Sequence, residues 1–217
     1  MNRLHTDFVR AQTAPCATAL VPEIRLHLAG EVTPLWEATE ASLAETGLPP
    51  PFWAFAWPGG QAIARTLLDR PELAQGRTVL DFAAGCGIAA IAAARAGAAR
   101  VRASEIDPFA AAAIALNADA NDVAVEVLEA DLLAAPAARH DLILAGDLCY
   151  ERPMAERVFA WLSAAARAGA EVLLADPGRA YLPKAGLVEI ASHEVRTTLE
   201  LENRTSMVTR VFRLEAE

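Results

Sequence analysis

The sequence contains little cysteine and no long apolar run, and both shortages exclude classes of protein. Its 217 residues include only three cysteines, which lie far apart and form no CxxC pair. We therefore expect neither a zinc site nor a disulfide framework. The stretch FAAGCGIAAIAAA meets Arg95 well before the 18 residues that a membrane span requires. Free thiols, and the absence of an apolar leader at the start of the sequence, predict a cytoplasmic protein.

Runs of basic residues are also missing. Lysine and arginine number 19 against 28 aspartates and glutamates, which gives a formal net charge of −9 and a pI near 5.0. This balance disfavours binding to nucleic acid or to an anionic membrane. The four histidines share no spacing, so we predict no metal site. Hydrophobic residues make up 54% of the chain, which permits a sizeable core and disfavours intrinsic disorder.

From residue 77 onward, short apolar strands alternate with alanine-rich helices. This alternation predicts an α/β fold with a Rossmann-like, mostly parallel sheet and helices on both of its faces. After Gly186, two β-like runs without a clear helix between them predict an antiparallel C-terminal addition that completes a seven-stranded sheet. The strands are expected within residues 77–82, 99–107, 123–131, 140–150 and 170–178, and the helices within 85–97, 108–122 and 152–169.

The N-terminal part lacks this rhythm. Its patterns predict a helix over residues 2–14 that ends at Pro15, a short strand ending at Gly30, and a helix over 33–47. We therefore expect residues 1–48 to form a helical and strand extension packed on a domain of residues 49–217. The segment PPPFWAFAWPGGQ begins that domain, and its prolines and paired glycines suit a shaped loop better than a packed interior.

A glycine loop follows the first strand of the alternating region. Gly85, Gly87 and Ala90 form a GxGxxA pattern between that strand and the next helix, which is the placement that a nucleotide-binding loop requires. Glu105 ends the next strand, where its carboxylate suits the two hydroxyls of a bound ribose. The pattern leaves an NAD-dependent oxidoreductase and a non-catalytic nucleotide-binding module open as alternatives.

Asp81 separates the possible ligands of this loop. A carboxylate at the end of the first strand would repel a pyrophosphate but would suit an ammonium group, such as that of S-adenosylmethionine. Ala83 stands where a first glycine is usual, and it fits there if its φ angle is negative. Asp131 ends the third strand, and its carboxylate suits either the amino group of an adenine or the capping of a helix or loop.

A second pair of polar residues follows the fourth strand. Asp147 and Tyr150 stand in the segment GDLCYERP, and side chains after a parallel strand face the crevice at the carboxyl end of the sheet. The alternative for Asp147 is a cap of the following helix. Phe52, Trp53 and Phe55 are expected to cover a sheet edge.

The segments DFAAGCG, SEID, GDLCY and DPGR resemble those of seven-β-strand S-adenosylmethionine methyltransferases. The D-x-x-Y pattern is similar to the motif of their lysine-methylating group. PFWAFAWPGGQ and DPGR resemble the electron transfer flavoprotein β-subunit lysine methyltransferases and their bacterial relatives.

This resemblance, which covers roughly residues 30–215, implies a protein-lysine N-methyltransferase with the electron transfer flavoprotein β subunit as its substrate. It implies that Trp57 lies beside S-adenosylmethionine. Asp176 and Arg179 end the fifth strand on the crevice side and are candidates for substrate binding, and the alternative is a helix-capping aspartate and a solvated arginine. Asp147 would hold the incoming ammonium, and Tyr150 would wall its channel or hydrogen-bond the amine. Methyl transfer to a small amine, such as a pyridine, remains an alternative.

Overall fold

A computed structural model of the chain describes residues 3–30, 50–136 and 138–216. A seven-stranded sheet has the order β5-β4-β3-β6-β7-β9-β8, and a separate two-stranded sheet pairs β1 with β2. The strands are β1 (Ala14–Cys16), β2 (Leu26–Leu28), β3 (Thr78–Phe82), β4 (Arg100–Glu105), β5 (Glu126–Glu129), β6 (Leu142–Gly146), β7 (Glu171–Asp176), β8 (Leu187–Arg196) and β9 (Ser206–Leu214).

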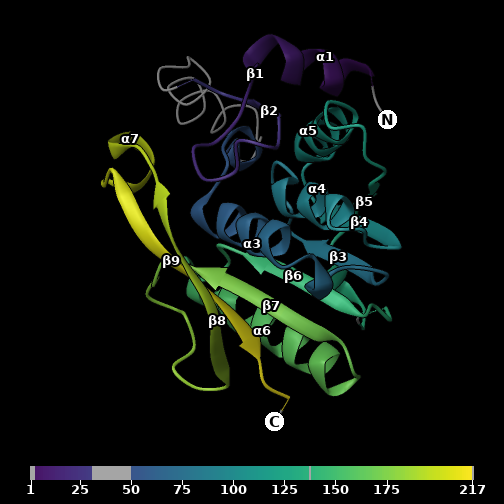
Figure 1. Ribbon diagram of the computed structural model, residues 1–217, viewed down its shortest axis with the longest axis vertical. Coiled ribbons are helices and arrows are strands. Elements are labelled where there is room, and N and C mark those ends of the chain that lie inside the picture. The colour runs from purple at the N-terminus through teal and green to yellow at the C-terminus, as the bar shows by residue number, and fades with distance from the viewer. Residues whose placement is uncertain (1–2, 31–49, 137, 217) are drawn as a thin grey trace.

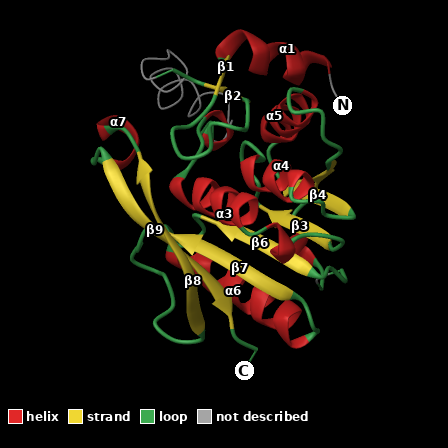
Figure 2. Ribbon diagram, viewed as in Figure 1, coloured by secondary structure: helices red, strands yellow, loops and turns green. Residues whose placement is uncertain are grey.

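The large sheet is mostly parallel, as the sequence pattern predicts. Strands β5, β4, β3, β6 and β7 run parallel to their neighbours, whereas β9 pairs antiparallel with both β7 and β8. Because the parallel strands are aligned, their carboxyl ends meet at one edge of the sheet (Figure 2). The predicted antiparallel C-terminal addition is confirmed, and it forms an edge of the sheet as the β8–β9 hairpin.

Helices cover both faces of this sheet (Figure 1). On one face lie α3, α4 and α5, whereas α6 packs on the other. A short helix, α7, interrupts the C-terminal hairpin, where the sequence gives no clear helical signal. No described helix is long and apolar enough to cross a membrane. The helices are α1 (Arg3–Gln12), α3 (Pro58–Asp69), α4 (Ile88–Arg95), α5 (Pro108–Asp119), α6 (Arg152–Arg167) and α7 (Leu199–Glu202), with 3₁₀ turns η1 (Phe52–Ala54), η2 (Pro71–Leu73) and η3 (Leu132–Ala134).

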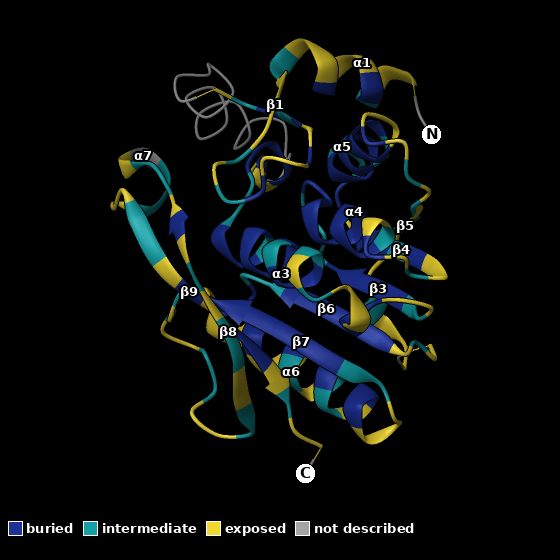
Figure 3. Cartoon of the chain, viewed as in Figure 1, coloured by how far each residue is buried: buried dark blue, intermediate teal, exposed yellow. Residues whose placement is uncertain are grey.

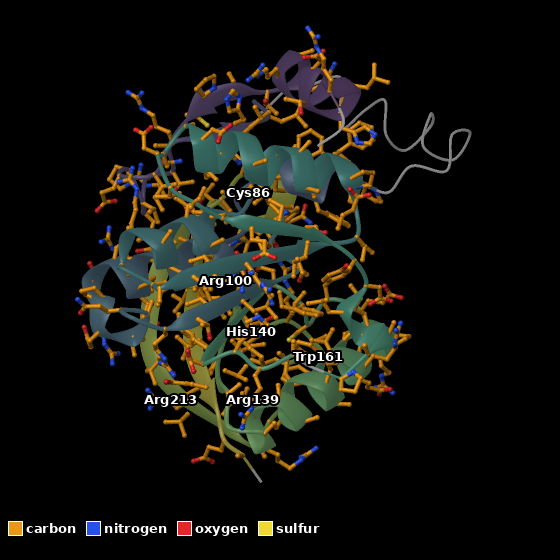
Figure 4. The ribbon with its side chains drawn as sticks, turned by 90° about the vertical axis from the view of Figure 1, so that its right-hand side faces the viewer. Cys86, Arg100, Arg139, His140, Trp161 and Arg213 are labelled. Carbon is orange, nitrogen blue, oxygen red and sulfur yellow. The ribbon has the colours of Figure 1, made fainter. Side chains whose placement is uncertain are left out.

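The core divides into two layers because successive strand residues point to opposite faces. In β6, Leu142 and Leu144 pack toward α3 and α4, whereas Ile143 packs toward α6. The central strands β3, β6 and β7 are therefore mostly apolar and buried, as strands covered on both faces require, and they are dark blue over most of their length in Figure 3. Trp161 of α6, labelled in Figure 4, lies 5.1 Å from the ring of Phe82 on the α6 face.

The N-terminal segment packs on α5. The predicted helix before Pro15 is confirmed, although α1 ends at Gln12, two residues earlier than expected, and Pro15 pairs with His27 in the small sheet. Asn117 of α5 and Asn121, in the turn after that helix, hold the segment that follows α1 through its backbone. The side chain of Asn117 accepts from the His27 amide at 2.6 Å, and Asn121 both accepts from and donates to the backbone of Arg25.

The expected helix over 33–47 lies outside the described residues. So does the boundary at residue 48, and the division of the chain at that position stays a prediction.

The start of α3 lies directly on the carboxyl end of β6. Pro58 begins the helix, where its missing N–H costs nothing. A Cβ atom added to Gly59 would stand 2.7 Å from the carbonyl oxygen of Ala175 and 2.8 Å from the amide nitrogen of Asp147. A Cβ on Gly146 would stand 2.9 Å from the amide nitrogen of Gly60. Backbone meets backbone here, so the paired glycines are a packing requirement.

We expect Gly59→Ala to lower the free energy of unfolding by about 1–3 kcal/mol, the usual cost of overpacking, or more because the obstacles are backbone atoms. Urea denaturation of the purified protein measures this loss. Gly30→Ala is the matched control, because a Cβ there meets no heavy atom within 4 Å, and its effect should stay within about 0.5 kcal/mol. Equal stabilities for the two variants would show that the start of α3 is not tightly docked.

Candidate functional site

A crevice opens where the carboxyl ends of β3 and β6 meet the glycine loop and the start of α3. It brings together Trp57, Asp81, Ala83, Gly85 and Asp147, which are distant in the sequence and which the sequence analysis assigns to one site. The remaining lining residues are Phe55, Gly60, Ile63, Ala84, Cys86, Ile88, Ala89 and Gly146.

A wider hollow lies elsewhere, between α4, α5 and the starts of β4 and β5. Arg100, labelled in Figure 4, lies in its lining, where the Arg100 guanidinium is paired with Glu126 at 3.0 Å. The hollow lies at the amino ends of the parallel strands, away from the glycine loop. Ligands of open α/β sheets bind at the carboxyl ends, so the crevice is the better candidate.

The glycine loop has the left-handed backbone that favours glycine. Gly85 has a φ of 56°, and Gly87, which precedes the first turn of α4, has a φ of 78°. A Cβ on Gly87 would come within 3.1 Å of Ile114 in α5, whereas one on Gly85 would meet nothing within 4 Å. Gly87 therefore lets α4 and α5 pack closely. Gly85 leaves open space where a ligand can approach the backbone.

Ala83 departs from the expectation for its backbone. Its φ is 51°, not negative, so this alanine stands in the left-handed region that a glycine adopts at no steric cost. The condition under which alanine fits at this position, a negative φ, is therefore not met.

Asp81 lies at the end of β3 with only 3% of its surface exposed. Its Oδ2 atom accepts a hydrogen bond from the Ala90 amide of the first turn of α4, at 2.9 Å. Burial raises the pKa of Asp81 to about 7, although the Ala90 amide opposes that shift. A buried carboxylate at this helix N-terminus is an acceptor for a cationic or N–H-bearing ligand group.

Glu105 braces the loop from the neighbouring strand. Its Oε1 atom accepts from the amide of Gly85 at 2.8 Å, and its Oε2 atom accepts from the amide of Ile106 at 3.1 Å. Burial raises the pKa of Glu105 in spite of these bonds. Each carboxylate oxygen has a further lone pair, so this grip on the loop still permits contacts to ligand hydroxyls.

Asp131 is not among the residues that line the crevice. It is exposed, and it caps η3 by accepting from the Leu133 amide at 2.9 Å. This is the capping arrangement that the sequence analysis leaves open for Asp131, and its proposed contact to an adenine stays a prediction.

Asp147 joins α3 to the sheet. Its Oδ2 atom accepts from the amides of Gly59 and Gly60, at 2.6 and 3.2 Å. It therefore caps a helix, but that helix is α3, not the following helix α6 as the alternative supposes. Its φ is 59°, and only 12% of its side chain is exposed. Burial raises the pKa of Asp147 to about 7, and the charge of Arg179 opposes the shift.

Aromatic rings surround the outer part of the site. The indole of Trp57 donates to the carbonyl of Phe52 at 2.8 Å, which fixes its ring beside the crevice. Tyr150 is 45% exposed, and its ring lies 6.1 Å from that of Phe52. Phe52 is itself 41% exposed. Trp53 and Phe55 are buried in a cluster with residues of α1 and α5, and Phe55 also lines the crevice, so the expectation that these two cover a sheet edge is wrong.

The DPGR segment forms the loop after β7. Asp176 is 1% exposed, and its Oδ1 atom accepts from the amides of Gly178 and Arg179, both at 2.6 Å. This turn directs the Arg179 guanidinium to Asp147 at 3.4 Å and to Glu202 at 2.6 Å. The sequence analysis does not select Glu202, because no motif surrounds it and its partners lie far away in the chain.

Comparison with known proteins identifies relatives of this chain. The family model of ribosomal protein L11 methyltransferase matches residues 63–150, which include the glycine loop and Tyr150. The chain is 36% identical over 197 residues to the electron transfer flavoprotein beta subunit lysine methyltransferase of Danio rerio, covering 90% of this chain and 70% of that protein. For the protein of the same name in Xenopus laevis, identity is 39% over 176 residues, with 80% and 70% covered.

The fold also matches a solved structure. The crystal structure of magnesium protoporphyrin IX methyltransferase from Synechocystis PCC 6803, with S-adenosylmethionine bound, aligns with a TM-score of 0.54 and 17% identity. The alignment covers 83% of this chain and 95% of that one. At this identity the likeness concerns the fold alone.

The positive φ of Ala83 generates a prediction. Ala83→Gly should raise the free energy of unfolding by about 0.5–1 kcal/mol, because relief of a left-handed backbone, which costs an L-residue roughly 1–2 kcal/mol, outweighs the chain entropy that glycine loses on folding. Ala84→Gly is the matched control, since Ala84 does not have a positive φ. It should lose about 0.5–1 kcal/mol through chain entropy. Chemical denaturation of both variants measures the difference, and two losses of equal size would contradict the left-handed assignment.

Proposed function

The chain belongs to the family of electron transfer flavoprotein β-subunit lysine methyltransferases, and on that premise we propose that it methylates lysine side chains of the electron transfer flavoprotein β subunit. It is an S-adenosylmethionine-dependent protein-lysine N-methyltransferase. The observation that carries the choice of an amine substrate is the carboxylate of Asp147, which is only 12% exposed and lines the same crevice as the glycine loop.

The residues of the crevice fit S-adenosylmethionine. A Cβ atom added to Gly85 would meet no heavy atom within 4 Å, so the loop has room for a ligand at its backbone. In our proposal Asp81 holds the amino group of the methionine part and Glu105 holds the ribose hydroxyls. Trp57 lies against the cofactor, and Asp131 contacts the adenine. When bound, S-adenosylmethionine supplies an electrophilic methyl group on a sulfonium.

The charges near Asp147 support a cationic substrate. The Arg179 guanidinium is surrounded by three carboxylates, those of Asp147, Asp176 and Glu202, and their charges raise its pKa against the opposing effect of burial. One positive charge among three acidic groups leaves surplus negative charge at the mouth of the site. A lysine ammonium complements that surplus, whereas a phosphate does not. The formal net charge of −9 likewise supports a protein partner over a nucleic acid.

Alignment is the main task of the protein in this reaction. The lysine ammonium, with an unperturbed pKa of about 10.4, must lose a proton before its nitrogen can accept a methyl group. Asp147 favours the charged amine, so we assign it the role of orienting the substrate nitrogen, with the proton passing to water. Tyr150 and Phe52 enclose the aliphatic part of the lysine side chain, and holding two reactants in line supplies much of the acceleration.

A transfer assay tests the substrate. The protein is incubated with radiolabelled S-adenosylmethionine and the purified electron transfer flavoprotein β subunit, and in parallel with nicotinamide as a small amine. Label on the β subunit supports the proposal. Label on nicotinamide alone, or on neither acceptor, contradicts it. The chain contains a single lysine, Lys184, so a Lys184→Arg variant removes lysine self-methylation as a source of label.

The same assay tests Asp147. We expect Asp147→Asn to lose ten- to more than hundredfold in transfer rate, which corresponds to a charge-assisted contact of about 1.5–3 kcal/mol. Asparagine keeps an acceptor oxygen for the Gly59 and Gly60 amides, so the fold survives and the affinity for S-adenosylhomocysteine should change little. Asp119→Asn, at an exposed position on α5, is the control. Wild-type turnover in Asp147→Asn would remove the residue from the substrate site.

The raised pKa of Asp81 predicts that cofactor binding depends on pH. Below its pKa of about 7 the carboxyl is protonated, and above it the group is ionised and attracts an ammonium. The affinity for S-adenosylhomocysteine should therefore rise roughly tenfold from pH 6 to pH 8, following the ionised fraction of Asp81. Isothermal titration calorimetry measures this rise. In Asp81→Asn the affinity for S-adenosylhomocysteine should no longer depend on pH. A pH dependence that persisted in this variant would belong to another group, such as Glu105.

A further inference from the structure

The arrangement around Arg179 points to a residue that no motif identifies. We infer that Glu202, on α7, is a positioning residue: it holds the Arg179 guanidinium so that Asp147 keeps a carboxylate oxygen for the substrate ammonium. This inference rests on the proposed function, because it concerns the same substrate site.

Arg179 is bound mainly to Glu202. Its Nη2 atom lies 2.6 Å from Oε1 of Glu202, and its Nη1 atom lies 3.3 Å from Oε2, which is a two-point contact between guanidinium and carboxylate. The same Nη2 atom lies 3.4 Å from Oδ1 of Asp147, which is at the long end of hydrogen-bond distances. The shorter contacts decide where the guanidinium stands.

The two oxygens of Asp147 are therefore unequally occupied. Oδ2 accepts from the two amides at the start of α3, whereas among the described residues Oδ1 has only the long contact to Arg179. The position of Arg179 thus decides whether Oδ1 is available to a second cation. If Glu202 were neutral, the guanidinium would move onto Oδ1 and compete with the lysine ammonium.

Helix α7 holds Glu202 in place from outside the parallel sheet. The Glu202 side chain is only 8% exposed, although α7 stands at the end of the long β8–β9 hairpin (Figure 1). Its neighbour Leu201 packs against the cluster that contains Trp53 and Phe55, which belong to the segment leading to Trp57. The hairpin is therefore anchored on the aromatic side of the site while it holds Arg179 on the charged side.

The proposed role of Glu202 differs from that of an ordinary structural ion pair in the property that it changes. A structural pair would contribute to stability alone. A restraint on Arg179 affects the affinity for the lysine substrate while leaving the cofactor crevice unchanged, and it acts only while Arg179 is present. This dependence on Arg179 can be measured with a double mutant.

Four proteins test the inference: wild type, Glu202→Gln, Arg179→Gln and the double variant. Binding of the electron transfer flavoprotein β subunit is measured by calorimetry with S-adenosylhomocysteine present, together with KM and kcat for methyl transfer. We expect Glu202→Gln to weaken binding and raise KM about tenfold or more, with kcat and S-adenosylhomocysteine affinity within about twofold of wild type. The double variant should match Arg179→Gln and bind the β subunit more tightly than Glu202→Gln does.

Two further variants distinguish a specific effect on substrate affinity from a general loss of stability. Glu202→Asp keeps the negative charge on a shorter arm and should retain more substrate affinity than Glu202→Gln, even where both lower the melting temperature equally. Glu189→Gln removes an exposed carboxylate that faces Arg210 at 3.5 Å on the same hairpin, and it should leave KM unchanged.

The possible outcomes separate this inference from the proposed function. An active wild type with an unshifted KM in Glu202→Gln overturns the inference alone. So does a double variant that binds more weakly than either single variant, because Glu202 would then act independently of Arg179. A wild type that neither binds nor methylates the β subunit overturns the proposed function, and the inference falls with it.

Discussion

The close approach of α3 to the end of β6 is the contact on which the site depends. Gly59, Gly60 and Gly146 have no side chains, so the backbone of the helix start lies against the backbone of the strand end. That approach brings the amides of α3 within reach of Asp147, and it sets Trp57, the residue before the helix, at the edge of the crevice. Rigid aromatic residues precede this helix because the same loop must both dock on the sheet and form a wall.

Asp81 and Asp147, at the ends of two strands, are stabilised in the same way, by amides at the start of a helix. Asp81 accepts from an amide in the first turn of α4, and Asp147 accepts from amides in the first turn of α3. A buried carboxylate is costly unless it is hydrogen-bonded, and a helix N-terminus supplies both the donors and a favourable dipole. The amides thus offset only part of the free energy that it costs to remove each carboxylate from water. A positively charged ligand group can offset the rest at either position.

The parts of the fold that the sequence predicts are those with a local signal. The alternation of strands and helices predicts the parallel sheet, and the spacing of Gly85 and Gly87 predicts the loop. Contacts between distant segments have no such signal. The bond from Gly59 to Asp147 joins residues 88 positions apart, and the pair of Arg179 and Glu202 joins the loop after β7 to helix α7. The left-handed backbone of Ala83 was missed because alanine itself gives no indication of that conformation.

The contacts of Asn117, in α5, and Asn121, just after it, have a consequence for how this sequence can change. Asn117 and Asn121 bind the backbone amides of His27 and Arg25, not their side chains, and the amide of Asn117 also donates to the carbonyl of Cys86 in the glycine loop. Any residue other than proline presents the same backbone N–H at those two positions. Substitutions along the N-terminal segment are therefore tolerated by this contact. Insertions and deletions that displace its path are not, because they would remove a partner from a side chain that also steadies the cofactor loop.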